Sequence, residues 1–171
     1  MSRFAGRPLD RVWFTFLVMH LPTTLLVDLQ VLYPASWVDG TPMQRLVQWY
    51  MDMTKDPVLS AGFTGGPEWD WFRSFICIEA FFQAPCFAIG AYMLWKNDRR
   101  VYPLLVAYGA STATTLVPVL QALFAADIST VELGMLLGSY VPFLVLPLGM
   151  AVDFGCRLVS IVSQADAAKK L

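Results

Sequence analysis

Charged residues are scarce in this sequence. Asp, Glu, Lys and Arg make up 15% of its 171 residues, whereas 57% of the residues are apolar. Typical soluble domains carry about 25% charged residues. The deficit therefore excludes an ordinary soluble domain and indicates a membrane protein. The net charge of −1 supplies no basic surface, so we do not expect nucleic acid as a partner.

Residues that bind metals are also few. The chain has one histidine and three cysteines, Cys77, Cys86 and Cys156, with no C-x-x-C spacing. The odd count and the spacing exclude a disulfide framework and a zinc site. We therefore expect no metal and no cofactor, and we expect the thiols to be buried as small apolar groups. Internal repeats and low-complexity tracts are absent, and the length suits one domain of residues 1–171.

Long apolar segments are what the sequence does have. Crossing the hydrocarbon core of a bilayer takes about 20 residues in an α-helix. Four segments reach that length, and together they predict an all-α bundle of four transmembrane helices. They are residues 12–32, 71–95, 102–124 and 133–152.

The distribution of Lys and Arg predicts the orientation of the bundle. With four spans, both termini and the second loop share one side, which carries nine of these residues against three on the other side. Basic residues are enriched in cytoplasmic segments, so both termini are expected in the cytosol.

The first loop, residues 34–68, is then lumenal. Residues 42–53 read as an amphipathic helix with Met43, Leu46, Val47 and Tyr50 on one face. We expect this helix to lie across the lumenal mouth of the bundle. The glycine-rich residues 62–67 read as a flexible turn.

Proline occurs in every predicted span. Each proline removes a backbone donor and tends to bend its helix. Bent helices leave space between them, so the prolines predict kinked helices around an internal cavity. The residues are Pro22, Pro85, Pro118, Pro142 and Pro147.

Two carboxyl groups fall inside predicted spans, where ionisable groups are costly and tend to mark function. Asp28 lies roughly 6 Å from the lumenal end of its span and Glu79 roughly 12 Å from the same side, at 1.5 Å per residue. We expect the two to meet within hydrogen-bonding reach and to share one proton, because like charges in low dielectric resist joint ionisation. Such a pair suits an apolar ligand with an ammonium group or a hydroxyl donor. The alternative is a helix-to-helix hydrogen bond that binds nothing.

Other polar residues extend this candidate site. Thr24 and Gln83 lie one helical turn from the two acids, and His20 lies two turns from Asp28. The third span offers Thr112 and Thr115. For the threonines the alternative is helix-packing glue, and for His20 it is a satisfied core residue.

The sequence resembles the EXPERA family of membrane proteins. The segments that resemble the family are spread over all four spans and follow the same order along the chain. It is carried by HLPTTLLVDLQ (20–30), KDPVL (55–59), FRSFICIEAFFQAP (72–85), TTLVP (114–118) and YVPFLVLP (140–147).

The resemblance implies a multi-pass protein of the endoplasmic-reticulum membrane that binds sterols and cationic amphiphiles. It implies that Asp28 and Glu79 bind the amine of a ligand, and it adds Tyr140 and Phe143 to the pocket, with Phe143 replacing a tyrosine of the family's receptor branch. It also implies a homodimer, a partner in another sterol-trafficking membrane protein, and a role in sterol homeostasis. The resemblance also links an Asp-Pro of the first loop, here Asp56-Pro57, to ligand binding. We interpret Asp56 as a helix cap or lid, together with Tyr50, rather than as a ligand contact.

Two functions remain open from the sequence. The first is a non-enzymatic binder of sterols and amines. The second is a sterol isomerase, which needs one acid and one base to shift a ring double bond. The family's isomerase branch places a histidine four residues before the first acid, where this chain has Thr24, and threonine is no proton donor near neutral pH. We therefore favour binding over catalysis.

Overall fold

The computed structural model describes residues 4–170. In that part of the chain every regular element is a helix. Four helical segments are long and apolar enough to cross a membrane, which confirms the predicted all-α fold. They are Pro8–Val31, Pro67–Trp95, Arg99–Ala125 and Thr130–Ala168. Residues 1–3 and 171 of the predicted domain, and with them Arg3 of the orientation count, lie outside the described residues.

The first span is not one continuous α-helix. It consists of α1 (Pro8–Leu26) and a 3-10 turn, Asp28–Val31. Between them Val27 leaves the helical region, with φ −122° and ψ −70°. The side chain of Gln30 donates to the carbonyl of Leu26, which gives a free carbonyl in the last turn of α1 a donor partner.

The second span contains a widened turn next to its proline. It runs through a 3-10 turn (Pro67–Trp69), α5 (Asp70–Ile78), a π-helical segment (Glu79–Gln83) and α6 (Ala84–Lys96). A proline lacks the N–H group and clashes with the carbonyl four residues earlier in an α-helix. The wider turn, in which the N–H of Ala84 donates to Glu79 O, lets the helix continue towards Pro85.

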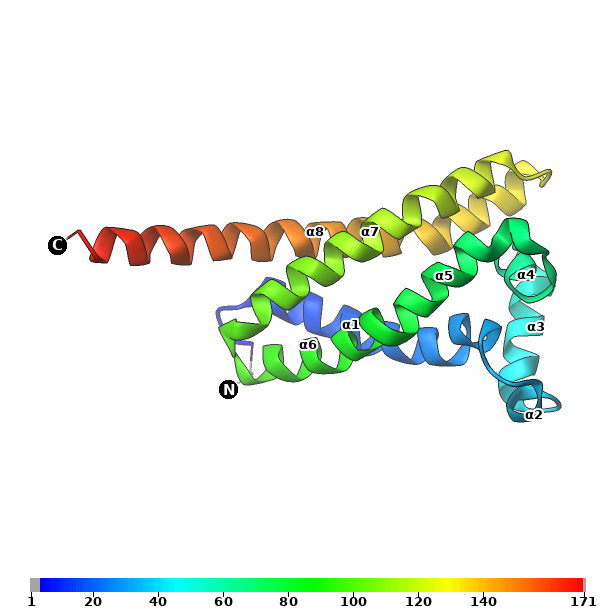
Figure 1. The fold of residues 1–171 in the computed structure, drawn as a ribbon, viewed down its shortest axis with the longest axis horizontal. Helices are drawn as coiled ribbons and strands as arrows, with labels where there is room; N and C mark the ends of the chain where they lie inside the picture. The colour runs from blue at the N-terminus through cyan, green and yellow to red at the C-terminus, as the bar shows by residue number, and fades with distance from the viewer. Residues whose placement is uncertain (1–3, 171) are drawn as a thin grey trace.

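The last two spans are α7 (Tyr102–Ala125), after a 3-10 turn at Arg99–Val101, and α8 (Thr130–Ala168). At 1.5 Å per residue α8 is about 58 Å long, against about 30 Å for a hydrocarbon core. The predicted span 133–152 therefore covers only part of this helix, because hydropathy marks only the apolar part. Figure 1 shows α8 continuing well past the other helices.

Three further helices form the first loop: α2 (Ala35–Val38), α3 (Pro42–Thr54) and α4 (Pro57–Thr64). The predicted amphipathic helix is confirmed as α3, with Val47 buried, but Leu46 is 40% exposed and does not belong to its buried face. The predicted flexible turn was wrong in part, because Gly62 belongs to α4. A side chain there would meet the ring of Phe72 at 2.7 Å, so glycine permits this close packing.

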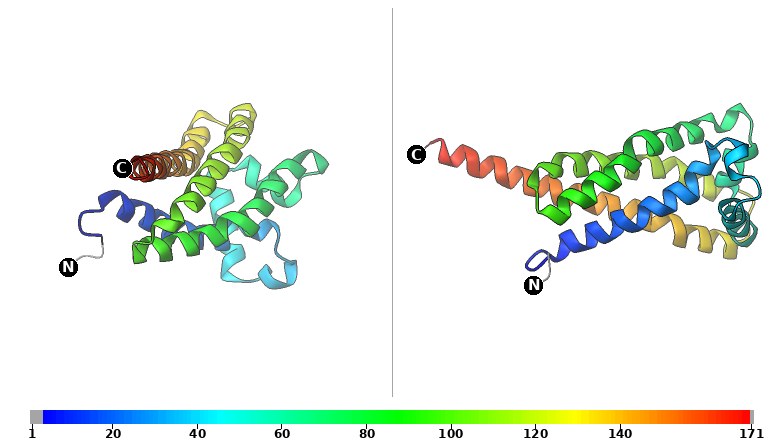
Figure 2. Two further views of the ribbon diagram at one scale, coloured as in Figure 1. Left: turned by 60° about the vertical axis from the view of Figure 1, so that its left-hand side comes forward. Right: turned by 90° about the horizontal axis from the view of Figure 1, so that it is seen from below.

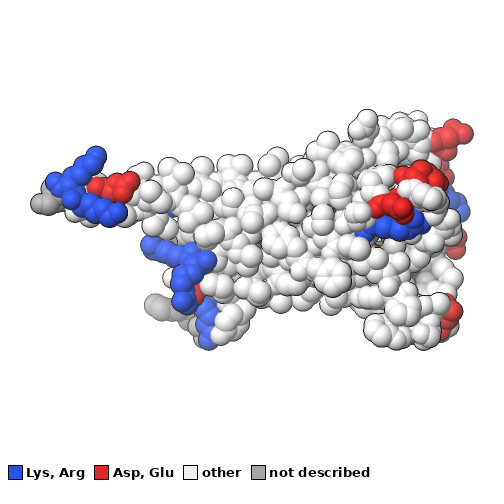
Figure 3. All heavy atoms as spheres, in the orientation of Figure 1, with Lys and Arg blue, Asp and Glu red and all other residues white. Residues whose placement is uncertain are grey.

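The long helices run side by side, and α2, α3 and α4 lie at one end of them (Figures 1 and 2). Both termini lie at the opposite end, as four spans require. On the face shown in Figure 3, charged side chains gather at the two ends and leave an uncharged band between them. This band suits a bilayer core, while the assignment of the termini to the cytosol stays a prediction.

Two apolar clusters make up the core. One, at the termini end, includes Leu17, Phe87 and Leu105, and the other, at the loop end, includes Phe72 and Leu136. The prediction of buried thiols holds for Cys86, whereas Cys77 is partly buried and Cys156 on α8 is exposed. The sequence could not show that Cys156 lies on an outward face of α8, although its neighbours Phe154 and Arg157 contact the other helices.

Helices α7 and α8 approach each other closely at Gly109. A Cβ atom there would lie 2.3 Å from the carbonyl oxygen of Pro147 and 3.0 Å from Ala151 Cβ. Backbone cannot move aside as a flexible side chain can, so we expect Gly109→Val to force the helices apart at a cost of about 1–3 kcal/mol. Thermal unfolding of the detergent-solubilised protein should show a lower Tm. Gly134→Val is the matched control, because nothing lies within 4 Å of its Cβ position; equal melting of the two variants would contradict the close packing.

Candidate functional site

A cavity of about 460 Å³ lies between the helices, on the loop side of the bundle. This volume falls in the range of small-molecule pockets, about 300–1,000 Å³. Its residues come from all four spans, and Tyr50 of α3 and Leu59 of α4 close the loop end. The lining consists of His20, Thr23, Val27, Asp28, Tyr50, Leu59, Phe72, Phe75, Ile76, Glu79, Gln83, Thr112, Thr115, Leu116, Val119, Gly138, Ser139, Tyr140, Pro142 and Phe143.

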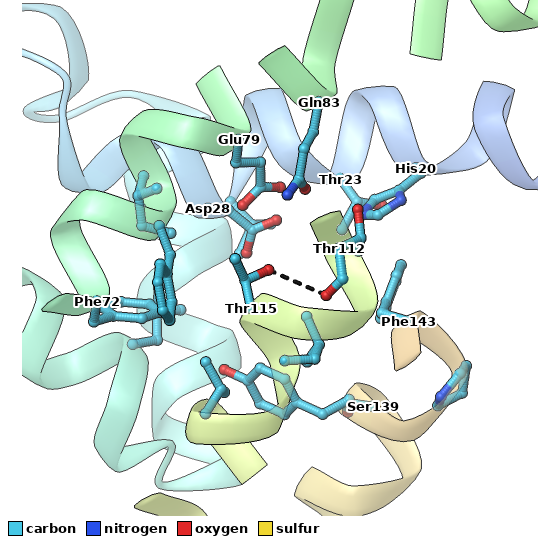
Figure 4. A pocket seen from close by; sticks show the side chains of 18 of the residues that line it. His20, Thr23, Asp28, Phe72, Glu79, Gln83, Thr112, Thr115, Ser139 and Phe143 are labelled. Atoms are coloured by element: carbon cyan, nitrogen blue, oxygen red, sulfur yellow. Dashed lines mark hydrogen bonds between the residues drawn. The ribbon is translucent and has the colours of Figure 1, made fainter. Parts of the chain in front are cut away.

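The two acids line this cavity, and their carboxyl groups point into the same space (Figure 4). The expected hydrogen bond between them, which requires that one carboxyl group carries a proton, stays a prediction. Glu79 Oε1 accepts a hydrogen bond from Thr24 Oγ1 at 2.6 Å. None of the described lining residues is Lys or Arg, so the acids face each other without a cationic side chain.

The break in the first span explains which residues reach the cavity. His20 and Thr23 lie about one helical turn apart on α1 and line it, as does Val27 at the break that follows the helix. Thr24 was expected to share the face of Asp28. It is instead fully buried, and its hydroxyl donates a hydrogen bond to the carboxyl group of Glu79. The helical spacing fails between Thr24 and Asp28, because α1 ends at Leu26 and Asp28 begins a separate turn.

Helix α7 supplies a polar wall opposite the acids. Thr112 and Thr115 both line the cavity, and Thr115 Oγ1 donates to the carbonyl of Thr112 at 3.1 Å (Figure 4). The hydroxyl of Thr112 is buried and finds no hydrogen-bond partner within residues 4–170. Gln83 lines the cavity as predicted and donates to Ser111 Oγ at 3.4 Å.

The end of the cavity towards the termini is aromatic. The ring of His20 stacks on Phe87 at 4.4 Å between centroids and packs against Phe143 at 4.5 Å. His20 Nδ1 lies 3.3 Å from the hydroxyl of Tyr108. His20 is therefore a hydrogen-bonded core residue that also forms part of the cavity wall, and its contact with a ligand stays a prediction.

Asp56 organises the loop end. Its Oδ1 accepts from the backbone N–H groups of Val58 and Leu59 at 3.0 Å each, so the predicted helix cap is confirmed for α4. Its Oδ2 accepts from the hydroxyls of Tyr50 at 3.1 Å and Tyr140 at 2.7 Å. Burial and the adjacent Asp56 carboxylate raise the pKa of the Tyr50 hydroxyl above its usual value. Asp56 does not line the cavity, but its hydrogen bonds connect α3, α4 and α8 at the loop end of the cavity.

Two anchors of this loop end escaped the sequence analysis. Gln30 donates from its side-chain amide to Met43 O at 2.9 Å, which ties α3 to the end of α1. Arg73 of α5 donates to the carbonyls of Gly62 and Gly66 at 3.2 Å each, which ties down the end of α4. A polar residue at the end of an apolar span was the available signal in both cases.

The apolar lining was also only partly predicted. Phe72, Phe75 and Ile76 lie within two turns of Glu79, so the helical period places them near it, and all three line the cavity. Gly138 and Ser139 come from α8, whose facing side depends on long-range packing. A sequence gives no register between separate helices.

Comparison with known proteins places the chain among related sequences. Residues 42–154 match the family described as EXPERA (EXPanded EBP superfamily). The sigma intracellular receptor 2 of Xenopus tropicalis is 30% identical over 152 residues, which cover 83% of this chain and 85% of the relative. The human protein of the same name is 29% identical over 77% of this chain and 78% of its own length.

A fungal relative carries a different name. The efficient mitochondria targeting-associated protein 19 of Schizosaccharomyces pombe is 30% identical over 155 residues, covering 88% of this chain and 77% of the relative. The family match spans more than half of the chain, and both kinds of relative cover most of it. This four-span membrane protein therefore belongs to the EXPERA family.

Proposed function

We propose that this protein binds sterols and hydrophobic cationic amines in its intramembrane cavity. One observation carries the proposal: Asp28 and Glu79 face one apolar cavity without a cationic side chain among its described lining. Carboxyl groups at membrane depth are costly unless they are paired or protonated. A ligand with an ammonium group would supply the missing partner.

The distribution of polar groups suits a long, apolar ligand with one polar end. The acids and Thr112 form a polar region, while Phe72, Ile76 and Val119 supply an apolar wall. An amine would make a charge-assisted hydrogen bond to a carboxylate, and a sterol hydroxyl would donate to the same oxygen. Both ligand classes therefore fit the same end of the cavity.

The family supports the biological setting of this proposal. Several relatives are named as sigma intracellular receptors, which agrees with a ligand-binding role. On the resemblance we further propose a place in the endoplasmic-reticulum membrane, a homodimer, a second sterol-trafficking membrane protein as a partner, and a role in sterol homeostasis. Because other relatives are named for mitochondria targeting, fractionation against markers of both membranes separates the two locations.

The isomerase alternative has one observation in its favour. His20 lines the same cavity as the two acids, so a titratable imidazole and carboxyl groups share one space. Its ring is, however, packed between Phe87 and Phe143 and hydrogen-bonded to Tyr108, which restricts its movement towards a ligand. Binding without turnover therefore remains the preferred function.

Equilibrium binding tests the proposal directly. Purified protein in detergent is titrated with a radiolabelled hydrophobic tertiary amine, with and without an unlabelled sterol. We expect saturable binding of the amine and its displacement by the sterol, because both use the same acids. Binding that does not saturate, or that the sterol leaves unchanged, would rule out the shared site. Chromatographic separation of the sterol after incubation, with NMR of the product, detects a shifted double bond, which would establish the isomerase instead.

A further inference from the structure

A second hollow lies on the outer surface of the bundle, between α1 and α8. It measures about 520 Å³, and Val12, Phe16, Met19 and Leu146 form its apolar floor. Met19 is 66% exposed and Val12 46% exposed, so this surface faces the bilayer rather than the core. The groove differs from the internal cavity in one chemical respect, because its lining contains a cation, Arg11, and no acid.

Arg11 is a free cation in the part of the chain that the structure describes. It is exposed, and none of the ion pairs or side-chain hydrogen bonds of residues 4–170 includes it. Its neighbours differ: Arg157 and Arg7 both bind the buried Asp10, at 2.5 and 2.9 Å. Those two arginines connect helices, whereas the guanidinium of Arg11 is available to a partner outside the protein.

The groove has the length of one bilayer leaflet. From Arg11 to Thr23 it follows α1 for twelve residues, or about 18 Å at 1.5 Å per residue. Half of a hydrocarbon core is about 15 Å. Arg11 would therefore lie at the interface on the termini side, with the far end of the groove near the middle of the bilayer. There it shares His20, Thr23, Pro142 and Phe143 with the internal cavity.

We propose that this groove binds one acyl chain of an anionic phospholipid, with the head group held by Arg11. The apolar floor suits the chain, and a guanidinium offers paired donors to a phosphate or carboxylate. The same charge repels the cationic amphiphiles proposed for the internal cavity. The two sites thus take ligands of opposite charge, one from each leaflet, and meet at four shared residues. This proposal stands on Arg11 and the groove and does not depend on the ligand of the acids.

Native mass spectrometry of the purified protein tests the head-group contact. The wild type, Arg11→Gln and Arg99→Gln are each titrated with phosphatidylserine and with phosphatidylcholine. Arg99 is the matched control, because it is an exposed arginine of the turn before α7, outside the groove. We expect Arg11→Gln to weaken phosphatidylserine binding about five- to tenfold, as the loss of one basic residue near a membrane surface implies, and to leave phosphatidylcholine unchanged. Equal losses in both variants would overturn the proposal, since they would indicate only a diffuse surface charge.

A second variant tests the chain-binding floor. Thr15 is exposed within the groove, so Thr15→Trp fills it without disturbing buried residues. We expect it to reduce the number of phosphatidylserine molecules retained, while Arg11 is intact. Unchanged retention would overturn the proposal. Loss of a protein dimer in Thr15→Trp, with lipid retention unaffected, would also overturn it and assign the groove to a second copy of the chain.

Discussion

Replacing Asp28 with asparagine should lower the affinity for a hydrophobic amine by about 10- to 150-fold, the equivalent of a charge-assisted hydrogen bond of roughly 1.5–3 kcal/mol. Asp28 lines the cavity with part of its surface accessible, and no described residue forms an ion pair with it. Asparagine has nearly the same shape but no charge, so the variant removes the ionic contact and little packing. Radioligand saturation binding on matched amounts of folded protein measures the change in Kd.

Two variants make this result specific to the site. Asp52→Asn makes the same chemical change on the exposed side of α3, away from the cavity lining, and should bind the amine as the wild type does. Glu79→Gln keeps an oxygen that can accept from Thr24 and should lose less affinity than Asp28→Asn. If Asp28→Asn binds the amine as tightly as Asp52→Asn, the acids are not the amine site.

The fold could be predicted largely from the sequence because the bilayer restricts the choices. Chains that cross it must satisfy their backbone within each segment, so apolar length alone predicts four helices. The same rule does not say where a helix ends outside the bilayer, and α8 accordingly continues to Ala168. Nor does it reveal the break at Val27, after which the side chain of Gln30 donates to Leu26 O.

The site was predictable where it depends on chemistry and not where it depends on register. Asp28 and Glu79 were found because carboxyl groups are unusual in apolar spans, and the structure brings both to one cavity. Thr24 was misplaced by assuming one continuous helix. Asp56 accepts hydrogen bonds from Tyr50, 6 positions away in the chain, and from Tyr140, 84 positions away. A contact over 84 positions leaves no local sequence pattern from which it could be predicted.

Replacing Asp56 with alanine should cause the largest loss of stability among the loop-end residues. Asp56 is 1% exposed, and its carboxylate accepts four hydrogen bonds, two from the first turn of α4 and two from Tyr50 and Tyr140. Losing a helix cap costs about 0.5–2 kcal/mol, and each hydroxyl left without its partner costs about 1–3 kcal/mol. The free energy of unfolding should therefore fall by about 3 kcal/mol, which lowers the Tm by roughly 10 °C in a protein of this length.

This variant should also loosen the cavity, because Tyr50 and Tyr140 line it and are held by the lost carboxylate. A bound amine should dissociate faster from Asp56→Ala even though Asp28 is unchanged. Tyr140→Phe removes one of the four bonds and should lower the Tm by about a third as much, while Asp52→Ala on the exposed side of α3 should not change it. If Asp56→Ala has the same Tm as Asp52→Ala and releases the amine at the wild-type rate, Asp56 does not close the site. A lower Tm with an unchanged dissociation rate would reduce its role to the cap of α4.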